Sequence, residues 1–411
     1  MNRRVLLICY YFPPLGLGGV GRPLNLFKQL PQHGYDCDIL TVKPVLYRAY
    51  EPELLNGLDA SRIHRAGSRD PQRIMYLLGF RKVKAETISK GRAVSEKFFP
   101  DSKIGWVKPA IKLGRKLCAR NDYDVIISTS PPMSSHLVGL ELSKQFGIPL
   151  VADFRDFWTI YKVEDVFIDP AKRARGLALL ERIKTEAAAI TTVNSSIAAY
   201  LNTGETITNG YDVSFAEHWK TPPGGECFTV GLLGHQHDTK ELQPLVDLYK
   251  QVEALREKKA EIRLLQVGQV DPEWLAAFFR EQGCDWEFDI RGHLPREATI
   301  QTLSQAHLFY IGISEREGPG FLPGRLSDLL ASGRPIVASA RSDSEVARLL
   351  LPSGHAACFD ADGSAQAVDY FAHTLDAFER GDYNCHPLTE YARRFSSDAM
   401  AHKFAQVMDR L

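Results

Sequence analysis

Short apolar segments of strand length alternate with helical segments along the whole chain, and they do so in two successive series. Strand-like runs lie at residues 5–11, 38–42, 124–128, 149–152 and 190–193, and then at 228–233, 262–267, 286–291, 308–313 and 335–339. Helical patterns separate most of them, and a last one covers about 398–411. Strands that alternate with helices form parallel sheets covered on both faces. The sequence therefore predicts an α/β protein with two doubly wound, Rossmann-like domains.

A short linker separates the two series. Residues 221–225 read Thr-Pro-Pro-Gly-Gly, a composition typical of a loop. The 411 residues also fit two domains better than one. We therefore expect an N-terminal domain over residues 1–220, a C-terminal domain over 221–390 and a final segment over 391–411. Ligands of such sheets bind at the carboxyl ends of the strands, and we expect the two edges to face one cleft.

The composition excludes several classes of protein. Hydrophobic residues make up 44% and charged residues 24% of the chain, as in folded proteins and unlike disordered ones. No apolar run approaches the ~18 residues of a membrane-spanning helix. The first residues resemble a signal peptide, but Pro13, Pro14 and a glycine-rich loop stand where a cleavage site belongs, so we expect a cytoplasmic protein. Seven cysteines without a close CxxC pair indicate free thiols rather than disulfides or a zinc site.

The charges are segregated although the formal net charge is zero. Residues 62–120 contain sixteen Lys/Arg and four Asp/Glu, which indicates an anionic partner for this stretch. Apolar and aromatic residues of the kind that enter a membrane interface are mixed with these charges: Ile74, Tyr76, Leu77, Leu78, Phe80, Phe98, Phe99, Ile104 and Trp106. We expect 47–120 to be mostly helical and this stretch, including Arg81, Lys82 and Lys84, to dock on an anionic membrane surface. The alternative is that these charges are solvated faces of helices packed on the sheet.

The glycine-rich loop after the first strand matches GxGxxG at residues 16–21. This pattern is typical of dinucleotide sites, but such sites also need an acid at the end of the second strand, where Lys43 follows Thr41 and Val42. Residues 12–15 also make the turn too long for that motif. The pattern predicts that the backbone at Gly18 and Gly19 approaches a phosphate closely, and the alternative is that the glycines only allow close packing.

Four motifs, in this order and spacing, resemble one family. They are residues 10–14 (Tyr-Tyr-Phe-Pro-Pro) with the glycine loop, residues 151–158 (Val-Ala-Asp-Phe-Arg-Asp-Phe-Trp), residues 208–212 (Thr-Asn-Gly-Tyr-Asp) and residues 322–338, which begin Leu-Pro-Gly-Arg-Leu-Ser-Asp. Together they resemble the retaining glycosyltransferases of the GT-B fold, family four, which use nucleotide-diphosphate sugars. The resemblance implies an N-terminal acceptor domain, a C-terminal donor domain and a last helix that crosses back to the first domain. The GT-B fold typically needs no divalent ion.

The resemblance also implies a site for the donor's diphosphate. Lys240 stands at the position of the family's phosphate-binding lysine. The family often has an arginine six residues earlier, where this chain has Gly234, and Arg325 is our candidate for the missing charge. We therefore predict catalytic roles for Lys240 and Arg325 in stabilising the leaving phosphates, with His235 or His237 beside them.

The rest of the predicted donor site is less complete. Asp328 matches the family glutamate that binds the ribose hydroxyls, and the loop with Gly292 and Leu294 resembles the loop that lies against the nucleobase. The other glutamate of the family's E-x7-E pattern falls at Gly320 and is absent. We expect Glu317, next to Gly318, or else Glu315, to act for it.

On the acceptor side, charged residues end an apolar strand. We predict that Asp153 orients an acceptor hydroxyl in catalysis and that Arg155 and Asp156 bind the acceptor, the alternative being a structural ion pair. His136, after the loop of residues 128–132, is a further candidate for acceptor binding or else a residue on a helix face. We expect no metal site, because the Asp-Cys-Asp run at 36–38 starts a strand and the Asp-Ala-Asp run at 360–362 lies in a turn.

These inferences lead to one main function and two alternatives. The sequence indicates a metal-independent, retaining glycosyltransferase, without a cofactor, that moves a hexose-type unit from a UDP-sugar or GDP-sugar to a hydroxyl of a lipid-linked or polysaccharide acceptor. The membrane surface that we expect as its partner is the inner face of the cell membrane. We expect no nucleic-acid partner. One alternative is an inactive relative that binds carbohydrate or a partner protein, suggested by Gly234 and Gly320, and the other is an NAD-dependent oxidoreductase, suggested by GxGxxG alone.

Overall fold

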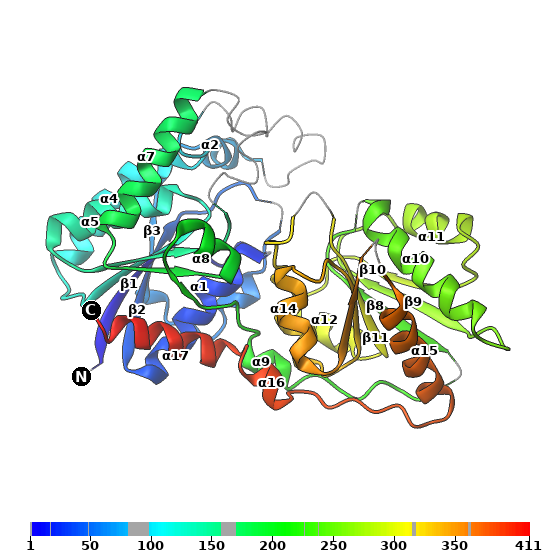
Figure 1. The fold of residues 1–411 in the computed structure, drawn as a ribbon. Coiled ribbons are helices and arrows are strands. Elements are labelled where there is room, and N and C mark those ends of the chain that lie inside the picture. The colour runs from blue at the N-terminus through cyan, green and yellow to red at the C-terminus, as the bar shows by residue number, and fades with distance from the viewer. Residues whose placement is uncertain are drawn as a thin grey trace. The chain divides into compact units, whose positions relative to one another are not determined.

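The computed structural model describes the chain except residues 1, 17, 48, 81–97, 158–169, 226, 237, 315–317 and 361–362. It divides into two compact units, Met1–Gly210 with Ser397–Leu411, and Tyr211–Ser396 (Figure 1). Among the described residues, no helix has both the length and the apolar character needed to cross a membrane.

The first unit contains a seven-stranded parallel sheet in the order β3-β2-β1-β4-β5-β6-β7. Its strands are β1 (Arg3–Ile8), β2 (Tyr35–Val42), β3 (Ile63–Ala66), β4 (Val125–Ser130), β5 (Leu150–Phe154), β6 (Ala189–Thr192) and β7 (Glu205–Thr206). The central strands are buried along most of their length because helices cover both faces.

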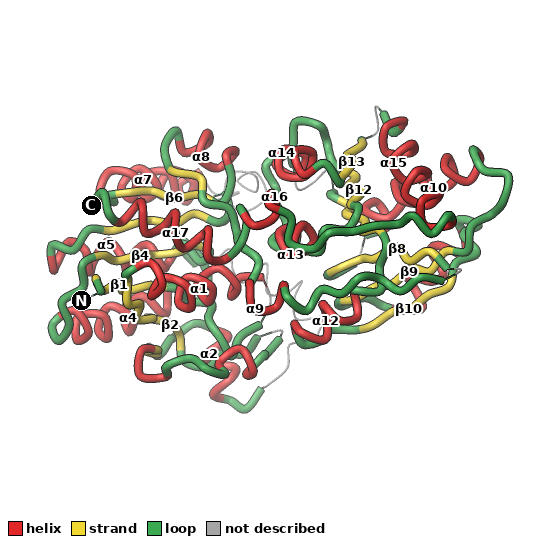
Figure 2. The backbone as a smooth tube through the Cα atoms, turned by 90° about the horizontal axis from the view of Figure 1, so that it is seen from below, coloured by secondary structure: helices red, strands yellow, loops and turns green. Residues whose placement is uncertain are grey.

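The first unit contains helices of both regular and 3-10 type, most of which pack on the two faces of this sheet. They are α1 (Gly18–Gln29), α2 (Pro71–Leu77), α4 (Ile104–Cys118), α5 (Ser134–Phe146), α7 (Pro170–Glu186), α8 (Ser195–Leu201) and α17 (Ser397–Met408), with 3-10 helices at Leu30–His33, Pro52–Leu55 and Ala60–Arg62. Leu6 of β1 packs into a cluster with α4, α5, α7 and α8, whereas Val5 packs into a second cluster with α1 and α17. Figure 2 shows α1 and α17 lying across the strands of this sheet.

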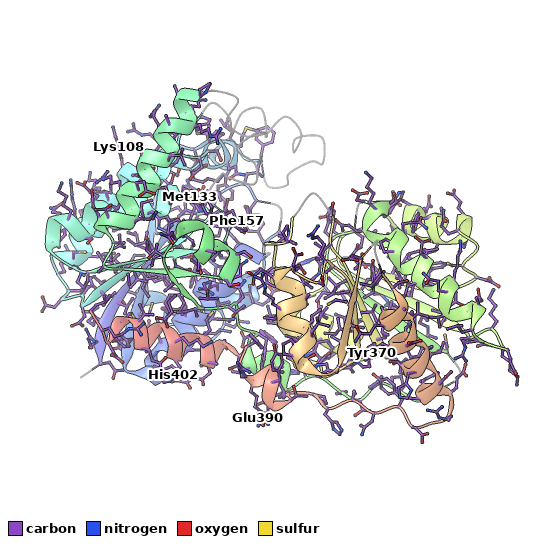
Figure 3. All side chains as sticks on the ribbon, viewed as in Figure 1. Lys108, Met133, Phe157, Tyr370, Glu390 and His402 are labelled. Atoms are coloured by element: carbon purple, nitrogen blue, oxygen red, sulfur yellow. The ribbon has the colours of Figure 1, made fainter. Side chains whose placement is uncertain are left out.

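The second unit contains a six-stranded parallel sheet in the order β10-β9-β8-β11-β12-β13. Its strands are β8 (Phe228–Leu233), β9 (Ile262–Val267), β10 (Glu287–Arg291), β11 (Leu308–Gly312), β12 (Ile336–Ser339) and β13 (Ala356–Phe359). Its helices are α9 (Val213–Ala216), α10 (Thr239–Ala254), α11 (Pro272–Glu281), α12 (Arg296–Leu303), α13 (Leu326–Ala331), α14 (Glu345–Leu350), α15 (Ala365–Glu379) and α16 (Glu390–Arg393), with a 3-10 helix at Leu351–Ser353. One face packs on α10, α11 and α15, where Tyr370 borders the cluster (Figure 3), and the other face packs on α12, α13 and α14.

The prediction of two doubly wound parallel sheets is confirmed, and the shared cleft stays a prediction. The expectation that residues 47–120 are mostly helical is wrong at one point, because β3 (Ile63–Ala66) pairs with β2 at the sheet edge. This strand has four residues and includes His64 and Arg65, so it lacks the continuous apolar run that marks a buried strand.

The units divide at different residues from those we expected. The amide of Tyr211 donates to the carbonyl of Phe395 at 2.9 Å, and Trp219 packs edge-to-face on Phe309 of β11. These contacts hold residues 211–219 in the second unit, so the expected boundaries at 220 and 390 both lie inside it. Helix α17 packs into the core of the first unit through Met400 and Phe404.

His307 makes the stability of the second unit depend on pH. Its Nδ1 accepts from the Thr229 amide at 2.9 Å and its Nε2 lies 3.0 Å from the Pro223 carbonyl, which requires the neutral ring. Burial lowers the pKa of His307 to about 4. The unfolded chain, with an ordinary pKa near 6.5, therefore binds more protons than the folded chain between about pH 6.5 and 4.

We expect His307 to lower the free energy of unfolding by about 3 kcal/mol as the pH falls from 6.5 to 4, and to leave it unchanged above pH 6.5. Urea unfolding at several pH values checks this, with His307→Gln expected to flatten the dependence and His373→Gln, at an exposed position, expected to leave it unchanged. An equally steep loss in His307→Gln would assign the effect to other groups.

Candidate functional site

The loops at the carboxyl ends of β8, β9 and β10 are bonded to one another. The amide of Gly234 donates to the Val267 carbonyl at 2.8 Å, and the buried Gln266 side chain donates to the Gly234 carbonyl at 2.7 Å. Gly268 has a φ of +136°, and a Cβ there would collide with the Gly234 carbonyl, so this approach requires glycine. The loop that begins at Gly234 is therefore held in one position against the loop of β9.

Arg325 occupies the space above Gly234. Gly234 has a φ of +104°, and a Cβ built on it would lie 2.8 Å from Nη1 of Arg325. The Arg325 side chain thus lies where a side chain at position 234 would begin. Burial lowers the pKa of Arg325 and Glu241 opposes that effect, but a guanidinium stays charged at neutral pH. Among the described residues, Arg325 forms no ion pair, and its guanidinium lies against the loop at Gly234.

Lys240 lies in the first turn of α10, directly after this loop. Asp238 caps the helix by accepting the Lys240 amide at 2.9 Å, and the Lys240 side chain is exposed. The end of β11 touches the same turn, because the Tyr310 hydroxyl donates to the Glu241 carbonyl at 2.8 Å and a Cβ on Gly312 would collide with that carbonyl. The loop that carries Arg325 follows β11. Arg325 and Lys240, 85 positions apart in the sequence, are therefore carried by a loop after β11 and by the first turn of α10 that the end of β11 touches.

His235 is exposed at the rim of this loop. Its Nδ1 lies 2.7 Å from the Gln269 carbonyl, so the ring is held against the loop of β9. His237 lies outside the described residues.

Asp328, the residue predicted to bind ribose, pairs with a residue that the sequence analysis missed. Nη2 of Arg296, at the start of α12, lies 2.5 Å from Oδ1 of Asp328. Burial raises the pKa of Asp328, Arg296 opposes this, and Asp212 adds to it. Arg296 directly follows the loop with Gly292 and Leu294. In the sequence, its positive charge after this loop is the feature that could have indicated a role in the site.

The other donor residues predicted in this unit lie in loops at the carboxyl ends of the strands. Gly292 is exposed with open space where a Cβ would be, whereas Leu294 packs partly into the core. Gly318 has a φ of +70° and its carbonyl accepts the Phe321 amide at 3.3 Å. Glu317 and Glu315 lie outside the described residues.

In the first unit, the glycine loop differs from a dinucleotide motif. Helix α1 begins at Gly18, so the loop from β1 spans residues 9–17. A Cβ on Gly16 would collide with the Glu51 carboxylate, and the Gly16 amide donates to the Ala49 carbonyl at 3.0 Å. A carboxylate against the first glycine disfavours a phosphate at this place. A Cβ built on Gly19 would lie 3.5 Å from the ring of Tyr11, which is an ordinary contact distance, so Gly19 is not required there by packing.

Asp153 is fully buried and bonded on both oxygens. Arg22 donates to them through Nε at 3.0 Å and Nη2 at 2.8 Å, and the hydroxyls of Thr129 and Thr191 donate at 2.7 and 2.8 Å. Burial raises the pKa of Asp153, but Arg22 and these hydrogen bonds outweigh it and hold the pKa below its usual range. This geometry favours the structural ion pair over a direct role of Asp153 in catalysis.

Arg155 holds two loops together. Its guanidinium donates to the carbonyls of Gly19 at 2.7 Å, Ser130 at 2.9 Å and Pro131 at 2.9 Å. The side chain thus fixes the start of α1 against the loop between β4 and α5, which is a positioning role. The contact of Arg155 with an acceptor stays a prediction. Asp156, next to it, is exposed.

His136 is a core residue of α5. It is fully buried, its Nδ1 lies 2.8 Å from the Ser128 hydroxyl, and its ring centroid lies 4.6 Å from that of Phe154. Burial lowers the pKa of His136 to about 3, so the ring is neutral at physiological pH. The structure favours the alternative that His136 is a helix-face residue.

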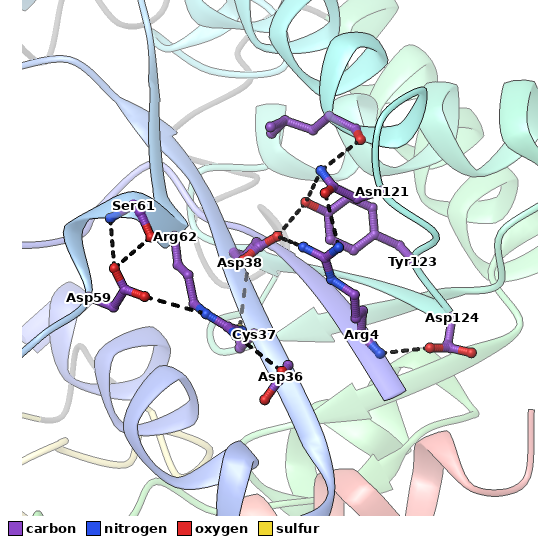
Figure 4. Close-up of polar contacts among 11 residues, drawn as sticks. Arg4, Asp36, Cys37, Asp38, Asp59, Ser61, Arg62, Asn121, Tyr123 and Asp124 are labelled. Atoms are coloured by element: carbon purple, nitrogen blue, oxygen red, sulfur yellow. Dashed lines mark hydrogen bonds and ion pairs between the residues drawn. The ribbon is translucent and has the colours of Figure 1, made fainter. Parts of the chain in front are cut away.

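The aspartates at 36 and 38 are paired with arginines at the amino end of the first sheet (Figure 4). Asp36 pairs with Arg62 at 3.0 Å, and Asp38 pairs with Arg4 at 2.8 Å and accepts from the Tyr123 hydroxyl at 2.6 Å. Within the described part of the chain, no group of His, Cys, Asp and Glu is arranged to hold a metal ion.

Comparison with known proteins identifies solved structures that share this architecture. No protein-family model matches the sequence, and no curated protein matches it either. Among solved structures, sucrose-phosphate synthase (tll1590) from Thermosynechococcus elongatus aligns over 100% of this chain and 99% of its own with a TM-score of 0.62 at 15% identity. The fold is GT-B.

Two further GT-B structures align over the whole chain. The apo form of the lipopolysaccharide outer core galactosyltransferase WaaB covers 99% of this chain and 100% of its own (TM-score 0.57, 13% identity). Anabaena Alr3699/HepE in complex with UDP and glucose covers 100% of both (TM-score 0.56, 14% identity). Identities this low establish the GT-B fold and leave the activity to be argued from the site.

Proposed function

We propose that this protein is a glycosyltransferase that takes a sugar from a nucleoside-diphosphate donor bound by its second unit. The observation that carries the proposal is the position of Arg325 over Gly234, beside the first turn of α10 with Lys240. Two cations and a helix N-terminus at the carboxyl ends of parallel strands fit a diphosphate. HepE, which has the same fold, has been solved with UDP and glucose.

The chemistry follows from where charge develops. When the bond between the anomeric carbon and the donor oxygen breaks, negative charge builds on the diphosphate and the sugar becomes cationic. Arg325 and Lys240 stabilise that negative charge, and the dipole of the 16-residue helix α10 adds to them. The hydrogen bonds that fix Gly234 keep this loop in place before the reaction, so little reorganisation is needed.

The finer assignments rest on the sequence resemblance. We propose transfer with retention, without a metal ion, to a hydroxyl of a lipid-linked or polysaccharide acceptor, with Asp328 near the ribose and Gly292 and Leu294 near the base. The anomeric proton coupling of the product, measured by NMR, tests retention. The NAD-dependent alternative is disfavoured by Glu51 at Gly16, while an inactive relative would bind the nucleotide without turnover.

Binding of nucleoside diphosphates is the first test. We expect UDP or GDP at 100 times Kd to stabilise the protein by about 2.7 kcal/mol, which raises Tm by about 5–10 °C for a unit of this size. NAD at the same concentration serves as the control and is expected to leave Tm unchanged. A shift with NAD alone would support the oxidoreductase. A shift with a nucleoside diphosphate but no release of UDP or GDP from any nucleotide sugar would support the inactive relative.

A further inference from the structure

Helix α2 of the first unit presents apolar side chains to solvent. Ile74, Leu77 and Leu78 are 48%, 65% and 68% exposed, and Phe80 is 51% exposed. The spacing of Ile74, Leu77 and Leu78 places them on one face of the helix, and α2 contains no buried residue. A helix on a globular domain normally turns such a face toward the core. In α2 the apolar face points to solvent instead.

Polar side chains attach α2 to the sheet. Asp70 caps the helix by accepting the Arg73 amide at 2.8 Å, and the same carboxylate accepts from the buried Tyr10 hydroxyl at 2.6 Å. Arg73 donates to the Pro44 carbonyl, and Gln72 accepts from Lys103. The helix is therefore fixed by its polar face, and its apolar face is held outward.

The end of the helix is equally well defined. The amide of Leu78 donates to the Ile74 carbonyl at 3.0 Å, and the amides of Gly79 and Phe80 donate at 3.1 Å to Tyr76 and Met75. Gly79 takes a φ of +95°, as the glycine that ends a helix does. The exposure of Leu77, Leu78 and Phe80 thus belongs to a hydrogen-bonded element.

Within residues 62–120, the described acids point inward while several basic side chains face solvent. Asp70 is buried, and Asp101 is turned inward, where it accepts from the Ser134 amide and hydroxyl at 2.8 Å. These are the two described acids of residues 62–120. Arg69 is exposed beside the helix, and Lys108 points outward from α4 (Figure 3). The described acids are therefore sequestered while basic side chains face solvent.

We propose that the apolar face of α2, made by Ile74, Leu77 and the C-cap residue Leu78, inserts together with the adjacent Phe80 into the interface of a lipid bilayer with anionic headgroups. Apolar side chains flanked by basic residues are what such an interface binds, because the hydrocarbon boundary takes the former and the headgroups attract the latter. An exposed apolar cluster of this kind marks an interaction site rather than a random surface. Trp106, expected among the interfacial residues, is fully buried instead, and Arg81, Lys82 and Lys84 lie outside the described residues.

Vesicle flotation with the full chain tests this surface, without donor or acceptor, so that its outcome is independent of the proposed function. We expect binding to vesicles of phosphatidylcholine with phosphatidylglycerol, and at least tenfold less binding to phosphatidylcholine alone. The variant Leu77→Ser/Leu78→Ser should lower the bound-to-free ratio at least tenfold, and Arg69→Glu should lower it on anionic vesicles only.

Matched controls come from the second unit. Leu255 is 67% exposed, so Leu255→Ser removes an equally exposed leucine, and Lys250→Glu reverses an exposed charge; neither should change flotation. Equal recovery of the native chain in the unbound fraction with both lipids would overturn the proposal. So would vesicle binding that survives Leu77→Ser/Leu78→Ser, or a dimer in sedimentation velocity that this double variant dissolves, since either would assign the face to another contact.

Discussion

Replacing Arg325 with alanine is expected to lower turnover of an accepted nucleotide-sugar donor on the order of a hundredfold. One preorganised charge at a developing anion contributes about 3 kcal/mol in comparable sites. Lys240→Ala should act in the same direction and more weakly, because the Lys240 side chain is exposed to water, which screens its charge. Steady-state kinetics with each variant, and titration of the nucleoside diphosphate, measure both effects.

The stability of Arg325→Ala separates a functional arginine from a structural one. Arg325 is partly buried without an ion-pair partner among the residues that the structure describes, and such a charge costs free energy in the folded state. We therefore expect Arg325→Ala to keep or raise Tm while activity falls, as at sites where function is maintained against stability. Arg325→Lys should recover part of the activity, because it restores the charge without the planar guanidinium.

Arg341→Ala is the matched control, since Arg341 belongs to the same unit, pairs with Asp343 at 2.9 Å and is largely exposed. It should leave turnover unchanged. Unchanged turnover in both Arg325→Ala and Lys240→Ala would remove the diphosphate site. A fall in Tm that parallels the fall in activity for Arg325→Ala would assign Arg325 to the scaffold.

The architecture could be predicted because buried parallel strands leave a strong signal. Runs such as residues 228–233 and 308–313 are largely apolar, since both faces of the sheet are covered, and they form β8 and β11. Strands at the edge of a sheet leave a weaker signal in the sequence. Ile63–Ala66 carries polar side chains and β7 has two residues, so neither has a pattern that separates it from a loop.

The candidate site could be predicted only as a set of positions. Sequence reasoning placed Lys240 and Arg325 after two strands, but the space above Gly234 that Arg325 fills is a property of packing. Arg296 was missed because its partner Asp328 lies 32 residues further on and on another helix. A motif shows that a charge stands at the end of a strand, but not which charge meets it.

Asp153 illustrates the same limit and allows the second large effect to be tested. Arg22 is buried and, besides both oxygens of Asp153, it donates to the Ile207 carbonyl at 2.7 Å and lies 5.1 Å from the ring centroid of Phe404 on α17. Arg22 therefore joins α1 to β5, to the residue that follows β7 and to the final helix α17. Removing one partner leaves the other charge buried and unpaired, which costs about 3–5 kcal/mol.

We expect Arg22→Met and Asp153→Ala each to lower the Tm of the first unit by roughly 10 °C. Arg115→Met, which breaks an exposed pair with Glu141 at 2.9 Å, should change stability by less than about 1 kcal/mol. Circular dichroism melts measure these shifts. A cost below about 1 kcal/mol for Arg22→Met would contradict the structural role.

Asp153→Asn then distinguishes the two roles considered for this residue. Asparagine keeps the shape but removes the charge that balances Arg22, so a structural aspartate predicts a large fall in Tm and an activity loss that follows the unfolded fraction. A catalytic aspartate predicts the reverse, a drop in kcat at unchanged Tm. Because both carboxylate oxygens are already bonded to Arg22, Thr129 and Thr191, we expect the first result. Turnover measured well below the Tm of the first unit, where the variant is folded, decides between them.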